Sequence, residues 1–220
     1  RFLAHNTHRE SPGEFPERDP NLRQMSRLPL PYRSPMLDRL RILGPGVYSL
    51  TGGRQIGKTT VLKQWMAELL QSGTDPQRLC YLAGELIDDH HTLVRLITEQ
   101  VAEWKGRGPG HLLVDEVTYI RDWDKGVKFL ADAGTLADVV LMLSGSDSAL
   151  IQEARMRFPG RRGTSPIVDF HIGPLTFGEY VGLAKRIPAA GRQSLLGPAS
   201  TIAESTRRQI DAEFARYLAH

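Results

Sequence analysis

Residues 52–60 read GGRQIGKTT, a stretch that fits the pattern G-x-x-x-x-G-K-S/T and decides the fold. A short β-prone segment, residues 47–50, comes before it. After it, apolar side chains recur with the period of a helix, at Val61, Leu62, Trp65, Met66, Leu69 and Leu70. A strand, a glycine-rich loop and a helix in this order are the context in which the pattern cradles nucleotide phosphates. The stretch therefore predicts a phosphate-binding loop.

The residue types of this loop suit a phosphate group and its metal ion. Glycines let backbone N–H groups point into one concavity, because they adopt dihedral angles that a Cβ atom forbids. Lys58 supplies a positive charge to the β- and γ-phosphates, and the Thr59 hydroxyl is a ligand for Mg²⁺. A glycine-rich turn without a ligand is the alternative interpretation. The predicted nucleotide-binding residues are Gly52, Gly53, Arg54, Gln55, Ile56, Gly57, Lys58, Thr59 and Thr60.

A second group of candidate residues follows the apolar run at 112–114, where Asp115 and Glu116 stand next to each other. A carboxylate at the end of a strand beside a phosphate-binding loop can hold Mg²⁺ through water. The next residue, Glu116, is then placed to orient and deprotonate an attacking water. Two acids at a solvated strand end are the alternative. We therefore predict Thr59 and Asp115 as metal ligands and Glu116 as the catalytic base.

Two further sets of polar residues follow the apolar run at 138–143. Ser144 and Ser146 are placed either to bond the water or the γ-phosphate, or simply to form a turn. A basic cluster comes next, and one of its arginines would neutralise transition-state charge in cis or from a neighbouring subunit. A surface patch or a nucleic-acid contact is the competing interpretation. The cluster comprises Arg155, Arg157, Arg161 and Arg162.

Apolar segments alternate with helical patterns along the chain, which predicts an α/β fold with a covered parallel sheet. We expect a three-layer α/β/α P-loop NTPase with a five-stranded, mostly parallel sheet. Residues 1–39 carry six prolines and predict an extended amino-terminal arm. Residues 40–187 form the expected P-loop domain. Residues 188–220 are a linker and a helix, expected to begin a missing carboxy-terminal region because the chain ends inside a helical pattern.

The composition is that of an ordinary globular protein, with 40% hydrophobic and 24% charged residues among 220. The net charge of +3 tolerates a nucleic-acid partner such as DNA without demonstrating one. Cys80 is the single cysteine and excludes an intramolecular disulfide, so it is expected to be a buried thiol. No apolar run has the length of a membrane span, which predicts a soluble, cytoplasmic protein with no membrane partner.

Together these motifs resemble the prokaryotic AAA-type ATPases often called archaeal ATPases, of the AAA/ASCE class. In that family an amino-terminal ATPase module commonly precedes winged-helix and nuclease-like regions. The resemblance implies that Lys58 and Thr59 bind nucleotide and Mg²⁺, that Asp115 is the Walker B carboxylate, and that Glu116 is the catalytic base. It also implies a sensor at Ser144 or Ser146 and an arginine finger at Arg161. Gly53 replaces a proline common in the family. The matching pieces, in order, are GGRQIGKTT, LLVDEVTYIRDW, LSGSDSAL, FPGRRG and GPLTFGEY.

The sequence thus favours an ATP-binding, Mg²⁺-dependent ATPase whose hydrolysis moves an attached or bound effector. An arginine finger acting in trans would make it a homo-oligomer. A small-molecule kinase, with residues 155–162 as a lid, is the first alternative, and a nucleotide-dependent switch with negligible turnover is the second. A GTPase is disfavoured because the guanine-reading sequence Asn-Lys-x-Asp does not occur in the chain.

Overall fold

The computed structural model describes residues 3–28, 32–40, 44–104, 108–146, 151, 167–184 and 204–218. The chain divides into two compact units. One comprises residues 1–26 and 33–173, and the other comprises residues 27–32 and 174–220. Among the described residues, no helix is both long enough and apolar enough to cross a membrane.

The first unit is built on a five-stranded sheet with the strand order β2-β3-β4-β1-β5. Every pair of neighbouring strands is parallel, so the expected "mostly parallel" sheet is parallel throughout. Its carboxyl ends therefore lie along one edge, where Ala83 pairs with Asp115 and Thr51 pairs with Gly145. The strands are β1 (Gly46–Thr51), β2 (Leu79–Ala83), β3 (Gly110–Asp115), β4 (Val139–Gly145) and β5 (Asp169–His171).

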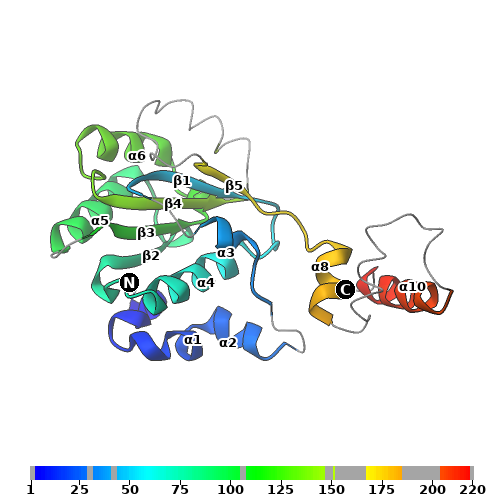
Figure 1. Cartoon of the computed structure of the whole chain (residues 1–220). Helices are drawn as coiled ribbons and strands as arrows, with labels where there is room; N and C mark the ends of the chain where they lie inside the picture. The colour runs from blue at the N-terminus through cyan, green and yellow to red at the C-terminus, as the bar shows by residue number, and fades with distance from the viewer. Residues whose placement is uncertain are drawn as a thin grey trace. The chain divides into compact units, whose positions relative to one another are not determined.

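Helices cover both faces of the sheet and complete the three-layer α/β/α architecture (Figure 1). On one face lie α5 (His90–Glu103) and α6 (Trp123–Asp132), which bury Leu93 and Val127. On the other lies α4 (Lys58–Gln71), which buries Trp65 and Met66. The central strands β3 and β4 are buried at every position, as their unbroken apolar runs predict for a parallel sheet. Cys80 is buried as expected.

The amino-terminal arm is not extended. Residues 3–28, the amino-terminal segment, form the short turns η1 (Leu3–His5), η2 (Thr7–Arg9) and η3 (Pro12–Glu14), followed by α1 (Phe15–Arg18) and α2 (Pro20–Ser26). Proline at the first turn of a helix loses no hydrogen bond, so these prolines begin helices instead of preventing them. Phe15 and Leu22 are buried in the same cluster as residues of α4, so the segment packs along the body of the first unit. The next helix, α3 (Met36–Arg39), precedes β1.

The second unit contains α8 (Phe177–Ala184) and α10 (Glu204–Leu218). A capping box opens α8: the Thr176 N–H donates to Glu179 over 2.8 Å, and the Glu179 N–H donates to the Thr176 hydroxyl over 3.3 Å. Tyr180 is buried with Ile210 packed against its cluster, whereas Phe214 is 44% exposed. Residues 177–184, which we assigned to the P-loop domain, therefore pack with the carboxy-terminal helix.

Candidate nucleotide-binding site

The glycine-rich loop connects β1 to α4, and two of its glycines are required by the backbone. Gly57 precedes the first residue of α4 with a φ of +96°, a left-handed conformation that disfavours any side chain. Gly52 is required by space instead, because a Cβ atom there would lie 2.5 Å from the Ile172 carbonyl oxygen. The middle of the loop, Gly53 to Gln55, is exposed. The loop is thus shaped by its neighbours and open to a ligand.

Lys58 begins α4 and is only 4% exposed. Its ammonium group donates to the carbonyl oxygens of Gly52 and Gly53, over 3.2 and 2.9 Å. It also lies 3.2 Å from Oε1 of Glu116. The buried charge is therefore satisfied by the loop itself and by the acid predicted to activate water. A bound phosphate would offer the same ammonium group oxygen acceptors in the same concavity.

Asp115 ends β3 and is the centre of the site's hydrogen bonds. Its Oδ2 accepts one from the Thr59 hydroxyl and one from the Tyr81 hydroxyl, each at 2.6 Å. The hydroxyl of Ser144, at the end of β4, donates to Oδ1. Ser144 also accepts from the Glu116 N–H over 3.2 Å. The predicted residues Thr59, Asp115, Glu116 and Ser144 thus lie together at the carboxyl edge.

Glu116 has a left-handed backbone, with φ of 49° and ψ of 49°. For a residue other than glycine this conformation is uncommon, and such residues concentrate at functional sites. Its Oε2 is buried and has no hydrogen-bond partner in the part of the chain that the structure describes. A buried acceptor without a partner is costly, so a water or ligand at this atom would be stabilised.

The site residues fit Mg²⁺ as well as phosphate. Magnesium prefers oxygen ligands and is commonly held by one or two protein groups together with water and phosphate oxygens. The Thr59 hydroxyl and the Asp115 carboxylate provide such oxygens 2.6 Å apart. Solvent and a metal ion can reach this pair, since Thr59 is partly exposed. These two residues are the ones that could hold the ion.

The remaining predicted residues are less constrained by the structure. Arg54 and Gln55 are exposed, and Ile56 and Thr60 are partly buried. Ser146 lies one residue beyond β4 and is partly exposed. Arg161, like the other three arginines of its cluster, lies outside the described residues, so its role stays a prediction.

Two residues of the site were missed by sequence reasoning. Tyr81 lies in β2, where its sequence neighbours are apolar, yet burial and the Asp115 charge raise its pKa, so that its hydroxyl stays protonated and donates. Gly84 directly follows β2. A Cβ atom there would lie 2.5 Å from the Glu116 carbonyl oxygen, so glycine lets the end of β2 approach the Asp115–Glu116 turn. A parallel strand next to β3 brings its own carboxyl end beside Asp115. Expecting β2 in that place was the signal that could have found both residues.

Similarity to known proteins points to one family. No curated protein sequence matches the chain. Among solved structures, a variant of RuvB from Thermotoga maritima is 15% identical, with a TM-score of 0.42. That match covers 73% of this chain and 46% of that chain, so this chain spans less than half the length of that protein. The family model described as an AAA domain matches residues 45–181, more than half of the chain and all of the glycine-rich loop. The chain belongs to the AAA domain family.

Proposed function

We propose that the chain binds ATP at residues 52–60, hydrolyses it with Mg²⁺, and uses hydrolysis to change the conformation of an attached or bound effector. The observation that carries the proposal is the convergence of Lys58, Asp115 and Glu116, with the buried Oε2 of Glu116 left without a partner among the described residues. Membership of the AAA domain family supports it.

Each residue has one task in this proposal. Lys58 exchanges the loop carbonyls and Glu116 for phosphate oxygens, which releases Glu116. Thr59 and Asp115 hold Mg²⁺, which when bound neutralises charge on the phosphates. Glu116 then accepts a proton from water, and Ser144 keeps the backbone of Glu116 and the carboxylate of Asp115 in place. Arg161 is the proposed finger toward the γ-phosphate, in cis or from a second copy in a homo-oligomer.

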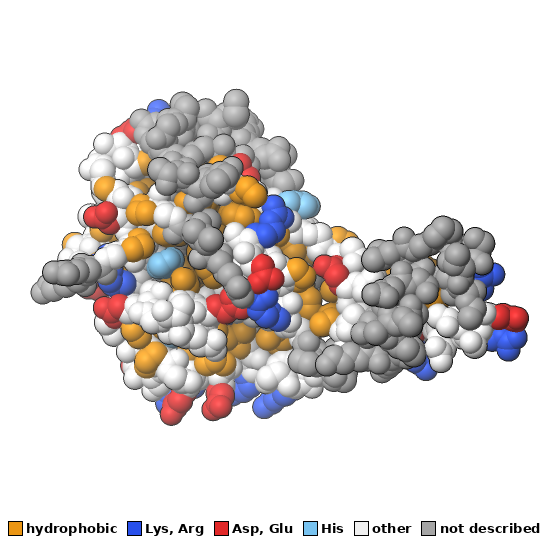
Figure 2. All heavy atoms as spheres, viewed as in Figure 1, with side chains coloured by type: hydrophobic (Ala, Val, Ile, Leu, Met, Phe, Trp, Pro, Cys, Tyr) orange, Lys and Arg blue, Asp and Glu red, His pale blue; other side chains and the backbone are white. Residues whose placement is uncertain are grey.

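The position of Glu116 directly after Asp115 and beside Lys58 supports hydrolysis, because a carboxylate there can orient and deprotonate water, whereas a kinase also needs a pocket for its acceptor. No nucleic-acid partner is part of the proposal. On the face shown in Figure 2, described lysine and arginine side chains are interspersed with aspartate and glutamate, and this mixture does not favour a polyanion. A DNA effect is therefore an outcome to be measured.

The test is phosphate release from Mg²⁺-ATP by the parent chain and by Glu116→Gln. The amide keeps the shape of the side chain but cannot take a proton from water, so the rate should fall by about 10²- to 10⁴-fold while ATP still binds. Glu85→Gln is the matched control, because Glu85 is an exposed glutamate near the same edge of the sheet. Its rate should equal that of the parent.

Three results would contradict the proposal or change it. Equal rates in Glu116→Gln and the parent would show that Glu116 is not the base. Transfer of phosphate to an added small-molecule acceptor, without hydrolysis, would establish the kinase alternative. ATP binding with negligible turnover in the parent would establish the switch. Adding DNA to each assay tests whether it is a partner.

A further inference from the structure

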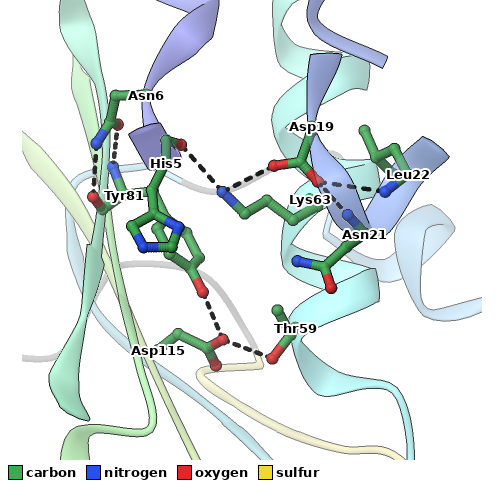
Figure 3. Close-up of polar contacts among 9 residues, drawn as sticks. All are labelled: His5, Asn6, Asp19, Asn21, Leu22, Thr59, Lys63, Tyr81 and Asp115. Carbon is green, nitrogen blue, oxygen red and sulfur yellow. Dashed lines mark hydrogen bonds and ion pairs between the residues drawn. The ribbon is translucent and has the colours of Figure 1, made fainter. Parts of the chain in front are cut away.

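A buried series of polar residues joins the amino-terminal segment to the metal-binding carboxylate of the candidate site. It runs from Asp19 through Lys63 and Tyr81 to Asp115. Figure 3 draws these residues, with dashed lines for the ion pair of Asp19 with Lys63 and the hydrogen bond of Tyr81 with Asp115. All four residues are at most 4% exposed. Buried polar side chains are costly unless they are paired, so a complete series of this kind needs an explanation.

The first contact is an ion pair. The ammonium group of Lys63 lies 3.2 Å from Oδ2 of Asp19 and donates to the His5 carbonyl oxygen over 3.0 Å. Asp19 is itself held in place, because its Oδ1 accepts from the backbone N–H groups of Asn21 and Leu22, over 3.0 and 3.2 Å. Two parts of the amino-terminal segment therefore fix the end of the Lys63 side chain.

The second contact joins Lys63 to Tyr81, whose hydroxyl lies at the candidate site. The Lys63 ammonium group lies 3.5 Å from the centre of the Tyr81 ring. A cation over an aromatic face attracts the ring electrostatically, more strongly where water is excluded. It also polarises the phenol, which strengthens the hydrogen bond that the hydroxyl donates to Asp115 over 2.6 Å.

The backbone of Tyr81 is held by the same segment. β2 is an edge strand, and the Asn6 side chain pairs with it as a neighbouring strand would. The Asn6 amide donates to the Tyr81 carbonyl oxygen over 2.8 Å, and the Tyr81 N–H donates to the Asn6 amide oxygen over 2.7 Å. The amino-terminal segment thus holds both the ring and the backbone of Tyr81.

We propose that Tyr81 is a positioning residue for Asp115, and that Asp19 and Lys63 act through it, which makes the amino-terminal segment part of the magnesium site. This inference rests on the proposed function, because it assigns Asp115 to the metal ion. The Tyr81 hydroxyl holds Oδ2 beside the Thr59 hydroxyl, so the two groups that would hold the ion already lie together. Without that donor, Asp115 has more orientations, and ordering it costs part of the metal affinity.

The first experiment measures equilibrium binding of a fluorescent ATP analogue to the full chain over a series of Mg²⁺ concentrations. Tyr81→Phe keeps the ring and removes only the hydroxyl. Affinity without Mg²⁺ should stay within about twofold of the parent, whereas the half-maximal Mg²⁺ concentration should rise by about 3- to 10-fold, the net effect of losing one ordinary hydrogen bond, since Thr59 and Ser144 still bond the carboxylate.

Tyr48→Phe is the matched control. Tyr48 is buried in the same hydrophobic cluster, but its hydroxyl donates to the Gly44 carbonyl oxygen, at the opposite end of β1 from the loop. If Tyr81 were merely structural, the two variants would behave alike. We expect both to lose some thermal stability, and only Tyr81→Phe to need more Mg²⁺.

A second set of variants tests the residues behind Tyr81. Lys63→Met combined with Asp19→Asn neutralises both partners, which avoids an unpaired buried charge and keeps the protein folded. We expect this pair variant to raise the half-maximal Mg²⁺ concentration by about 2- to 5-fold, less than Tyr81→Phe because the hydroxyl remains. In the Tyr81→Phe background it should add less than about twofold, because Lys63 then has no hydroxyl to act through.

The outcomes separate this inference from the proposed function. Absence of Mg²⁺-dependent binding in the parent would overturn both. Normal Mg²⁺ dependence in the parent together with an unchanged or lower half-maximal concentration in Tyr81→Phe would overturn only the role of Tyr81. Equal effects of the pair variant with and without the Tyr81 hydroxyl would show that Lys63 acts on Asp115 directly through its charge.

Discussion

Lys58 and Lys63 lie five positions apart on α4, and both are buried and paired with an acid. Lys58 faces the candidate nucleotide site, whereas Lys63 faces the amino-terminal segment. Their side chains are 3% and 0% exposed, and each ammonium group lies 3.2 Å from a carboxylate. The partners differ. Glu116, beside Lys58, is 22% exposed, whereas Asp19, beside Lys63, is 2% exposed.

The difference shows that a buried lysine paired with an acid does not by itself mark the position where a ligand binds. Around Lys63 the charged partner is enclosed, and burial lowers the pKa of the ammonium group while the charge of Asp19 opposes that shift. Around Lys58 the other acceptors are carbonyl oxygens of an open loop. The first pair has no acceptor that a ligand could replace and holds the amino-terminal segment against α4, and the second is available for exchange with a ligand.

The largest effect on stability should come from breaking the enclosed pair. Lys63→Met leaves the Asp19 carboxylate buried without its counter-ion, and the free energy of unfolding should fall by about 3 kcal/mol. The value is at the low end for buried pairs because Asp19 keeps two backbone N–H donors. Urea unfolding measures it.

Lys58→Met is the control, because its partner Glu116 can turn toward water, and its stability should stay within about 1 kcal/mol of the parent. Adding Asp19→Asn to Lys63→Met should restore most of the loss. If both single variants lost the same stability, the distinction between an enclosed and an open pair would be wrong.

A smaller effect concerns the pH dependence of the enclosed region. Burial lowers the pKa of His8 and of His111 to about 4, with Arg9 and Lys63 adding to the shift at His8 and Arg78 at His111. The unfolded chain therefore binds protons first as the pH falls. Stability is fully present above about pH 6.5 and decreases toward pH 4, by about 2 kcal/mol per histidine at pH 5.

Urea unfolding at pH 7 and pH 5 isolates one histidine when His111→Phe is compared with the parent. His111 packs edge-on against Trp65, so a phenyl ring suits the position. The decrease in stability between the two pH values should shrink by about 2 kcal/mol in the variant. A decrease equal to that of the parent would show that His111 is protonated equally in the folded and unfolded chains.

The sheet and the site could be predicted largely from sequence, because their determinants are local. Residues 52–60 are contiguous, and Asp115 directly follows the strand that positions it. Parallel strands bring their carboxyl ends to one edge, so proximity of Thr59, Asp115 and Ser144 follows from the order of elements. For Ser144 the sequence left a turn as an equal alternative, which its hydrogen bonds to Asp115 and Glu116 disfavour.

The amino-terminal segment could not be predicted, because its contacts are distant in sequence. Asn6 bonds Tyr81 across 75 positions, and no local pattern marks that pairing. Its prolines were read as breaks, although proline also begins helices. Tyr81 was missed for a related reason: a tyrosine in an apolar strand has the same pattern whether its hydroxyl meets solvent or a carboxylate.

The most direct test of the account is calorimetric titration of Mg²⁺-ATP into the parent chain and into Lys58→Met. We expect saturable binding to the parent and an affinity weaker by about 100-fold or more in the variant. Lys58 is the lysine of the loop, and the charged hydrogen bonds that an ammonium group donates to phosphate are stronger than neutral ones. The Lys63→Met and Asp19→Asn pair variant, titrated without Mg²⁺, should bind ATP as the parent does. Equal affinity in the parent and in a stably folded Lys58→Met would contradict the assignment of residues 52–60 as the nucleotide site.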